Sequence, residues 1–307
     1  MNRAEYRQLL LALKENPANL AKYRERYRNI YPFSDAVFKL LMLNNAPRLV
    51  VFLNAMMGLE GDARIKDFTF EPQEIPDELN GKNVIFDIFG RNEKDEPILV
   101  EVQQTGSEFY MDRLLYYTSR LIDTLKRRSE DYVLPRIYVL SVLTCEQFRN
   151  EPETYFHHVH FVKNGRPFYH KLDFFFVEVE KFFRIDAGTP EERREKHKRA
   201  EMLRFFRKVI NEEEIPEPMF EDGFYGKLLK DLSLKRYEDK VLMKEIDEMR
   251  DTISMNRTAF RRGELVGARR AERAKAREMA KGLFEDGIPM EIIVRRSGLT
   301  EEEIRAL

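Results

Sequence analysis

Short apolar runs separated by polar breaks dominate the middle of the chain and predict β-strands, because β-branched and aromatic residues recur in them. Two of these runs flank the polar residues 92–97, which predicts a β-hairpin. A second hairpin is predicted around the turn at residues 163–166. The predicted strands are residues 65–70, 84–90, 98–103, 136–144, 155–162 and 172–179.

Helical patterns precede, interrupt and follow those strands. Ser34 is placed to cap the start of one helix, and Gly58 is placed to end the next. The order of helix, three strands, helix and strand predicts a mixed α/β fold. From about Thr189 the sequence changes to long, charged helical stretches. The predicted divisions are an N-terminal helical segment, a core and a charged helical C-terminal region, at residues 1–30, 31–188 and 189–307.

Two patterns in the C-terminal region each leave two interpretations open. Apolar residues spaced four and three apart predict a short coiled-coil-like seam, which would drive self-association or pack back on the core. Residues 261–281 hold eight basic and three acidic residues, net +5, which fits a contact with DNA backbone or a solvated helix face. The seam residues are Leu242, Ile246, Met249 and Ile253.

The end of the chain resembles a helix-turn-helix, in which Thr300 and Glu303 are spaced for a capping box. The helix that would enter a DNA groove is acidic and stops within two turns. Acidic side chains repel phosphates, so we interpret this segment as a packing or oligomerisation hairpin.

Two acids interrupt the apolar runs of the first hairpin. If its turn is centred near Lys94, Asp87 stands opposite Glu101, and Gln103 shares their face. Directly paired residues have Cβ atoms about 4.5–5.5 Å apart, so two facing carboxylates repel each other, and burial increases the cost. A divalent cation would relieve both effects. Alternatively, this face of the hairpin meets solvent and the acids need no metal.

Composition limits the class of protein. Of the 307 residues 43% are hydrophobic, which excludes overall disorder, and the 53 basic and 54 acidic residues give a net charge of −1. Any affinity for nucleic acid must therefore come from local clusters. There is no apolar run near 18 residues and no signal peptide, so we expect a soluble, cytoplasmic protein without a membrane segment. The single cysteine, Cys145, excludes an internal disulfide framework.

Three histidines lie close together in a predicted strand. Alternation puts His158 and His160 on one face and His157 on the other. Zinc is one interpretation, but no cysteine or nearby acid completes a ligand set, so exposed or hydrogen-bonded histidines are favoured.

Several segments together resemble one known group of proteins. The hairpin "FDIFG…ILVEVQ" is similar to the D…ExK/Q signature of the PD-(D/E)xK nuclease superfamily, and the wider pattern resembles its Rpn branch, which comprises recombination-promoting nucleases and transposases. The resemblance implies a restriction-endonuclease-like mixed-sheet core flanked by helices, and cleavage of DNA that depends on a divalent metal. The matching segments are "SDAVFKLLM", "LVVFLNAMMG", "MDRLLYYTSRLI", "LPRIYVLSVL", "LDFFFVEVEKFF" and the terminal "LFEDGIPMEIIVRRSGLTEEEIRAL".

The resemblance also assigns roles to residues. It implies that Asp87 and Glu101 are metal ligands, with Asp35 as a further ligand or water-orienting acid. An acid in the first turn of a helix is also favoured by the helix dipole, so Asp35 has a purely structural explanation as well. The implied ion is Mg²⁺, with Mn²⁺ as an alternative. Gln103 takes the place where many members carry lysine, and an amide orients water without supplying charge.

Two basic residues are candidates for binding a DNA phosphate. Arg113 would pair with it through two hydrogen bonds, and Lys39 would assist, although either is equally explained as a surface ion-pair residue. The functional hypothesis is a metal-dependent DNA endonuclease linked to recombination or mobile DNA, with a homo-oligomer formed through the C-terminal helices. The alternative is a non-catalytic DNA-binding or oligomerisation protein on a decayed nuclease core.

Overall fold

The computed structural model divides into two compact units, Met1–Glu245 and Ile246–Leu307, which we describe separately. The residues that it describes are 1–43, 45–75, 84–104, 106, 108–127, 133–186, 197–220, 223–237, 242, 276–277, 279–281, 283–284 and 289–305.

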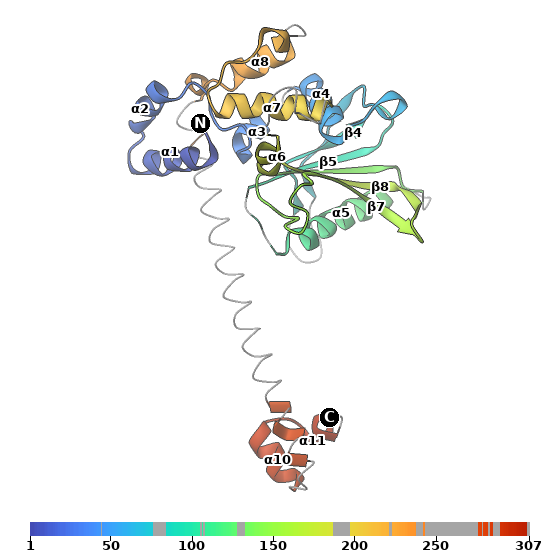
Figure 1. Cartoon of the computed structure of the whole chain (residues 1–307). Coiled ribbons are helices and arrows are strands. Elements are labelled where there is room, and N and C mark those ends of the chain that lie inside the picture. Colours follow the sequence, from blue (N-terminus) through green and yellow to red (C-terminus); the bar gives the residue numbers. More distant parts are fainter. Residues whose placement is uncertain are drawn as a thin grey trace. The chain divides into compact units, whose positions relative to one another are not determined.

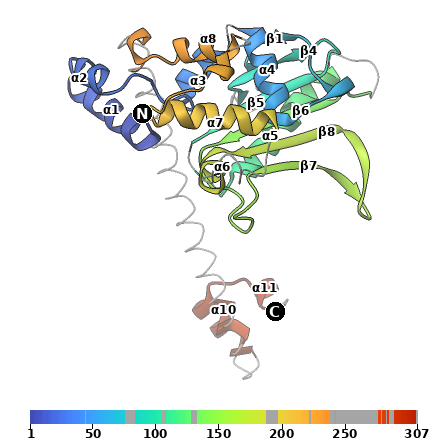
Figure 2. The same ribbon diagram turned by 45° about the horizontal axis from the view of Figure 1, so that its top comes forward.

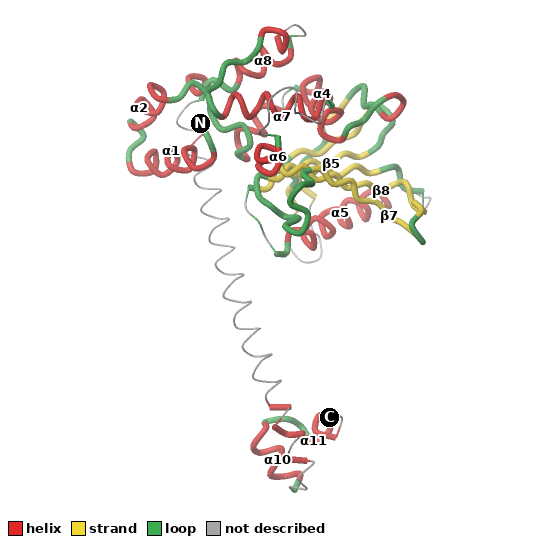
Figure 3. Tube along the Cα trace, viewed as in Figure 1, coloured by secondary structure: helices red, strands yellow, loops and turns green. Residues whose placement is uncertain are grey.

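A six-stranded mixed sheet forms the centre of the first unit (Figures 1 and 3). Its strands are β1 (Phe68–Phe70), β4 (Ile88–Asn92), β5 (Pro97–Gln103), β6 (Ile137–Leu143), β7 (Phe156–Lys163) and β8 (Arg166–Glu178). They lie in the order β1-β4-β5-β6-β8-β7. The central strands β5, β6 and β8 run parallel, whereas β1, β4 and β7 pair antiparallel with their neighbours. The predicted mixed α/β fold is confirmed.

Helices cover both faces of this sheet. In Figures 1 and 2, α5 lies on one face, and α4 and α7 lie on the other. The α5 face buries Leu114 and Leu121 against strand residues such as Leu99, Val139 and Phe174, which gives one of the hydrophobic clusters of the core. The helices of this unit are α1 (Arg3–Glu15), α2 (Asn19–Arg26), α3 (Asp35–Met42), α4 (Ala46–Met57), α5 (Tyr110–Arg127), α6 (Val179–Ile185), α7 (Lys198–Ile210) and α8 (Phe224–Asp231).

Capping and turn residues determine where several of these helices and strands begin or end. The side chain of Ser34 accepts a hydrogen bond from the backbone N–H of Val37, and Gly58 ends α4 with φ +69°, as both were predicted to do. The turn between β7 and β8 has positive φ at Asn164 and Gly165, which fits the predicted hairpin. The predicted N-terminal helical segment, residues 1–30, contains two helices that are separated at residues 16–18, where Pro17 interrupts the backbone hydrogen bonds.

The predicted strand at residues 84–90 is also divided. Residues Val84–Ile85 form β3, which pairs with β2 (Glu74–Ile75) in a separate two-stranded sheet, and β4 begins only at Ile88. Simple alternation would place Phe86 on the face opposite Phe89. The bend at Asp87 breaks the alternation, so the two rings pack together 5.4 Å apart on the α5 side.

Gly90 allows β1 to approach β4 closely. A Cβ atom at this position would lie 2.2 Å from the carbonyl oxygen of Thr69 and 2.5 Å from the ring of Phe68. Any other residue would push β1 away from the sheet, so glycine at this point of the β4 strand is a packing requirement.

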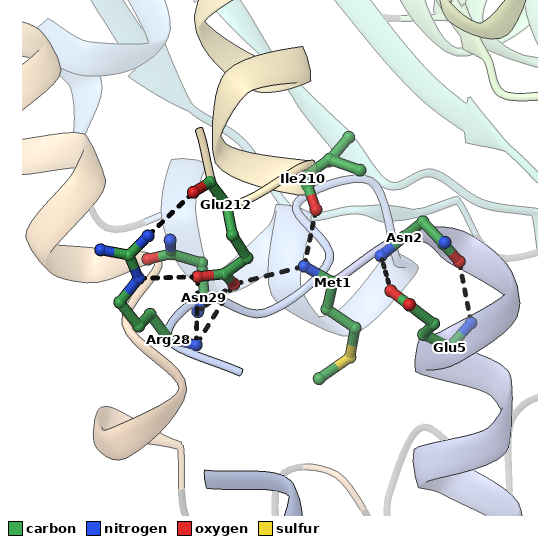
Figure 4. A network of polar contacts seen from close by, with 7 residues as sticks. All are labelled: Met1, Asn2, Glu5, Arg28, Asn29, Ile210 and Glu212. Carbon is green, nitrogen blue, oxygen red and sulfur yellow. Dashed lines mark hydrogen bonds and ion pairs between the residues drawn. The ribbon is translucent and has the colours of Figure 1, made fainter. Parts of the chain in front are cut away.

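Polar contacts join the start of α1 to the end of α7 (Figure 4). The amino group of Met1 donates to the carbonyl oxygen of Ile210 at 2.7 Å, and it lies 3.4 Å from Oε1 of Glu212. The same carboxylate accepts from Arg28 and Asn29. The predicted N-terminal helical segment is therefore bound to a helix that follows the last strand of the sheet in sequence.

In the second unit, α10 (Met290–Ser297) and α11 (Glu301–Arg305) bury Ile293, Leu299 and Ile304 together. The predicted capping box is present, because Thr300 N–H donates to Glu303 Oε2 and Glu303 N–H donates to Thr300 Oγ1. Of the seam residues, Leu242 is buried in the first unit, and the other three lie outside the described residues, as do most of residues 261–281. The predicted boundary near residue 189 also lies there and stays a prediction.

Within the described segments, no single helix has the length and apolarity needed to cross a membrane. Helices α3 and α4 meet that requirement only as a pair bent by 115°. Their apolar side chains Phe38, Leu49 and Phe52 are buried inside the unit, which is typical of core helices.

Candidate functional site

The register of the β4–β5 hairpin brings Asp87 to the side of Glu101. Phe89 pairs with Leu99 and Ile88 pairs with Val100, which is the predicted register, so Asp87 and Glu101 are the next residues beyond the end of this ladder. At Asp87 the chain bends out of β4. The Asp87 side chain then contacts the residue after Glu101, because its Oδ2 accepts a hydrogen bond from the backbone N–H of Val102 at 2.7 Å.

A second contact fixes the backbone of this bend. The side-chain amide of Gln73 donates to the carbonyl oxygen of Asp87 at 2.7 Å. Asp87 is therefore held at two points: the neighbouring strand binds its carboxylate, and the segment that precedes β2 binds its backbone.

Glu101 lies within β5 on the face that α5 covers. Its side chain is only 8% exposed, and its Oε1 atom is buried without a hydrogen-bond partner. The neighbouring residue on β6 is Ser141, which accepts a 2.8 Å hydrogen bond from the hydroxyl of Tyr110 on α5. A buried carboxylate oxygen without a partner is costly unless something else binds to it.

Helix α3 contributes an acid and a base to the same place. Asp35 occupies the first turn of α3 and Lys39 follows one turn later, so their side chains share a face. The ammonium of Lys39 lies 2.9 Å from Oδ2 of Asp35 and 3.0 Å from Oδ1 of Asp87. Lys39 thus bridges the two carboxylates from the helix to the hairpin.

Burial and mutual repulsion raise the pKa values of the hairpin acids. Burial, followed by repulsion from Asp35, raises the pKa of Asp87 to about 7, although Lys39 and the Val102 N–H partly oppose this change. Burial, followed by repulsion from Asp87, raises the pKa of Glu101 well above its ordinary value. Burial acts to lower the pKa of Lys39, but the carboxylates of Asp87 and Asp35 outweigh it, so its pKa is raised and the ammonium stays charged.

Gln103 and Arg113 meet at the end of β5. The guanidinium of Arg113 donates to the amide oxygen of Gln103 at 2.5 Å and lies over the ring of Tyr110, 5.4 Å from its centre. Gln103 is half-buried and Arg113 is exposed. The amide of Gln103 and the solvent-exposed guanidinium of Arg113 therefore lie beside the acidic pair.

The donor set fits a divalent cation bound by few protein ligands. Among the residues that the structure describes, no three acidic, histidine or cysteine side chains gather closely enough to hold a metal alone. Two carboxylates remain, one with an unpartnered oxygen and one paired with an ammonium. Mg²⁺ is usually bound in this way, by one or two carboxylates together with water and phosphate oxygens.

The strand histidines take part in hydrogen bonds. Nε2 of His157 lies 3.2 Å from Oε2 of the buried Glu178, and Nε2 of His158 lies 2.7 Å from Oδ1 of Asp173. Acids do lie nearby, because the antiparallel pairing of β7 with β8 puts Asp173 directly opposite His160, but among the described residues no three such side chains gather to hold a metal, and the favoured hydrogen-bonded histidines are confirmed. Asp173 also accepts from Arg136 at 2.8 Å, which supports the structural interpretation of this cluster.

Several contributions to the acidic site were not predicted from the sequence. The spacing of Asp35 and Lys39 is a visible i,i+4 pair, but its contact with Asp87 joins segments that are far apart in the sequence and has no local signal. The same is true of Gln73. Tyr110 begins α5, and it reaches the neighbourhood of Glu101 only because the parallel pairing of β5 with β6 puts its hydrogen-bond partner Ser141 beside Glu101.

Comparison with known proteins gives one match. The family model described as "PD-(D/E)XK nuclease family transposase" matches residues 32–254, well over half of the chain. Neither the curated proteins nor the solved structures provide a match. The matched region contains the whole mixed sheet, the hairpin acids and α3, and it confirms the resemblance inferred from the sequence motifs. The chain belongs to the PD-(D/E)XK nuclease family transposases.

Proposed function

We propose that this protein is a divalent-metal-dependent endonuclease that hydrolyses phosphodiester bonds in DNA, and that it acts in recombination or on mobile DNA. The observation that carries the proposal is the closely spaced pair of acids Asp87 and Glu101. Both side chains are largely buried, both pKa values are raised, and Oε1 of Glu101 has no hydrogen-bond partner. Buried, mutually repelling acids of this kind are typical of functional sites.

Asp87 and Glu101 would hold the ion, with Asp35 as the nearest further acid. When bound, Mg²⁺ or Mn²⁺ would make a water molecule more acidic and offset charge on the phosphate. The amide of Gln103 would orient the attacking water, because an amide both donates and accepts hydrogen bonds. Arg113 beside it would bind a phosphate oxygen, since its guanidinium is exposed next to the acidic pair.

A non-catalytic role is the alternative, and one observation favours it. Gln103 carries no positive charge where many members of the superfamily have lysine, and Arg113 already binds its amide oxygen. On this view, the chain binds DNA or associates through its C-terminal helices without cleaving.

An assay of supercoiled plasmid cleavage distinguishes the endonuclease from the non-catalytic role. We expect the wild-type chain to nick or linearise plasmid with Mg²⁺ or Mn²⁺, and EDTA to abolish this. Glu101→Gln should lose cleavage, whereas Asp95→Asn should retain it, because Asp95 is 83% exposed in the turn of the same hairpin. Cleavage that is equal in the wild type and Glu101→Gln would indicate a contaminating nuclease and refute the enzymatic proposal. DNA binding without cleavage would favour the non-catalytic role.

A further inference from the structure

A cation of the protein itself already lies in the acidic site. The Lys39 ammonium is 2.9 Å from Asp35 and 3.0 Å from Asp87, so it offsets part of the negative charge of the two carboxylates. Its side chain is 26% exposed, and the Asp87 side chain is 14% exposed. The ion pair is therefore partly shielded from water, where the charges interact more strongly than at an open surface.

Lys39 and a divalent cation compete for the same oxygen atom. An ion bound to Oδ1 of Asp87 would lie roughly 2.0–2.6 Å from it. The Lys39 nitrogen lies 3.0 Å from the same atom, so the two positive charges would be only a few ångströms apart. Repulsion at that distance in a partly buried site favours removal of one of them.

We propose that Lys39 is the resting counterion of this site, that a divalent cation must displace its ammonium from Asp87 in order to bind, and that the displaced ammonium then binds the phosphate of the DNA. The inference rests on the proposed function and extends it. Lys39 acts as a positioning residue when the site is empty and as a phosphate ligand when the metal is present. Metal binding and DNA binding would thereby be coupled.

Two properties of the chain support this exchange. Lysine holds its charge on a flexible four-carbon chain, so the ammonium is able to move while the α3 backbone stays in place. At the end of β5, beside the acidic pair, this chain has the neutral Gln103. A cation released from Asp87 would supply charge that Gln103 lacks.

Calorimetric titration with Mn²⁺, without DNA, tests the competition. We expect Lys39→Met, which keeps a chain of similar length without the charge, to bind Mn²⁺ roughly tenfold more tightly than the wild type. Lys39→Arg keeps the charge and should bind no more tightly than the wild type. Lys66→Met is the matched control, because Lys66 is exposed outside the site, and its affinity should be unchanged. Equal or weaker binding by Lys39→Met would overturn the proposal.

A second measurement observes Lys39 directly in the wild-type chain. The ¹⁵Nζ resonance of Lys39, assigned by its loss in Lys39→Arg, should shift when Mg²⁺ saturates the site, while the other lysine resonances stay in place. An unchanged Lys39 resonance at saturation would also refute the displacement. Failure of the wild type to bind any divalent cation is a different result, because it would refute the metal site of the proposed function itself.

Discussion

The carboxylate of Asp87 accepts a 2.7 Å hydrogen bond from the backbone N–H of Val102, the residue that follows Glu101 on the adjacent strand. This bond holds the two acids side by side before any cation arrives. The structure therefore maintains electrostatic repulsion that a metal would relieve, and the first two predictions follow from this strain.

Replacement of Asp87 by asparagine should stabilise the metal-free protein. The asparagine side chain would keep an oxygen that accepts from Val102 while removing one buried negative charge. We expect Asp87→Asn to unfold with a free energy about 1–2 kcal/mol higher than that of the wild type in EDTA, in the manner of other strained functional sites. Mg²⁺ should raise the melting temperature of the wild type more than that of the variant, because ligand binding stabilises only the state that binds it.

Thermal melts of both proteins, with and without Mg²⁺, measure these effects. Asp95→Asn is the control, since it changes the same residue type in the exposed turn. If the Asp87→Asn and wild-type curves coincide under both conditions, Asp87 and Glu101 behave as ordinary surface acids.

The raised pKa of Asp87 also predicts how stability depends on pH. The ordinary pKa is 3.8, whereas in the folded protein the pKa of Asp87 is about 7. Between these two pH values the folded state keeps the proton of Asp87, and the unfolded state has lost it. The contribution of Asp87 to the free energy of unfolding therefore falls as pH rises from about 4 to about 7, and it is constant above that range. The free energy of unfolding, measured with urea in EDTA across this pH range, should decline less steeply with pH for Asp87→Asn than for the wild type. Parallel pH profiles would contradict the raised pKa.

Much of the candidate site followed from the sequence because local patterns specify it. The polar break around Lys94 determines the register of the hairpin, and strand alternation then puts Glu101 and Gln103 on one face. The bend at Asp87 was not predicted, because it depends on the pairing of β3 with β2, which β-propensity does not reveal. Contacts over long sequence distances, such as that of Lys39 with Asp87, depend on how α3 packs and leave no periodic signal.

Arg113 is expected to contribute one phosphate contact. Arg113→Gln should weaken DNA binding, measured with catalytically inactive Glu101→Gln as the background, and reduce the slope of log K against log salt concentration by about 1. The exposed Arg64 is the matched control, and Arg64→Gln should leave the slope unchanged. A slope that is the same in Arg113→Gln as in the background would show that Arg113 does not bind DNA phosphate.

Self-association through the C-terminal helices is tested best by a cut between the two units. Phe205 and Phe206 of α7 are buried within the first unit, so a cut near residue 186 would remove part of its core. A chain of residues 1–245 should show a smaller oligomer than the full chain in light scattering. The same number of subunits in both oligomers would assign self-association to the first unit, and two monomers would refute self-association.

The central claim, that Asp87 and Glu101 form the metal site of a nuclease, is tested most directly by anomalous diffraction from crystals soaked with Mn²⁺. The account predicts a peak between Oδ1 of Asp87 and Oε1 of Glu101, roughly 2.0–2.6 Å from each oxygen, with the Lys39 ammonium moved away from Asp87. The same soak of Asp87→Asn crystals should give a weaker peak. Mn²⁺ bound elsewhere in the wild type, with these two acids left without an ion, would contradict the claim.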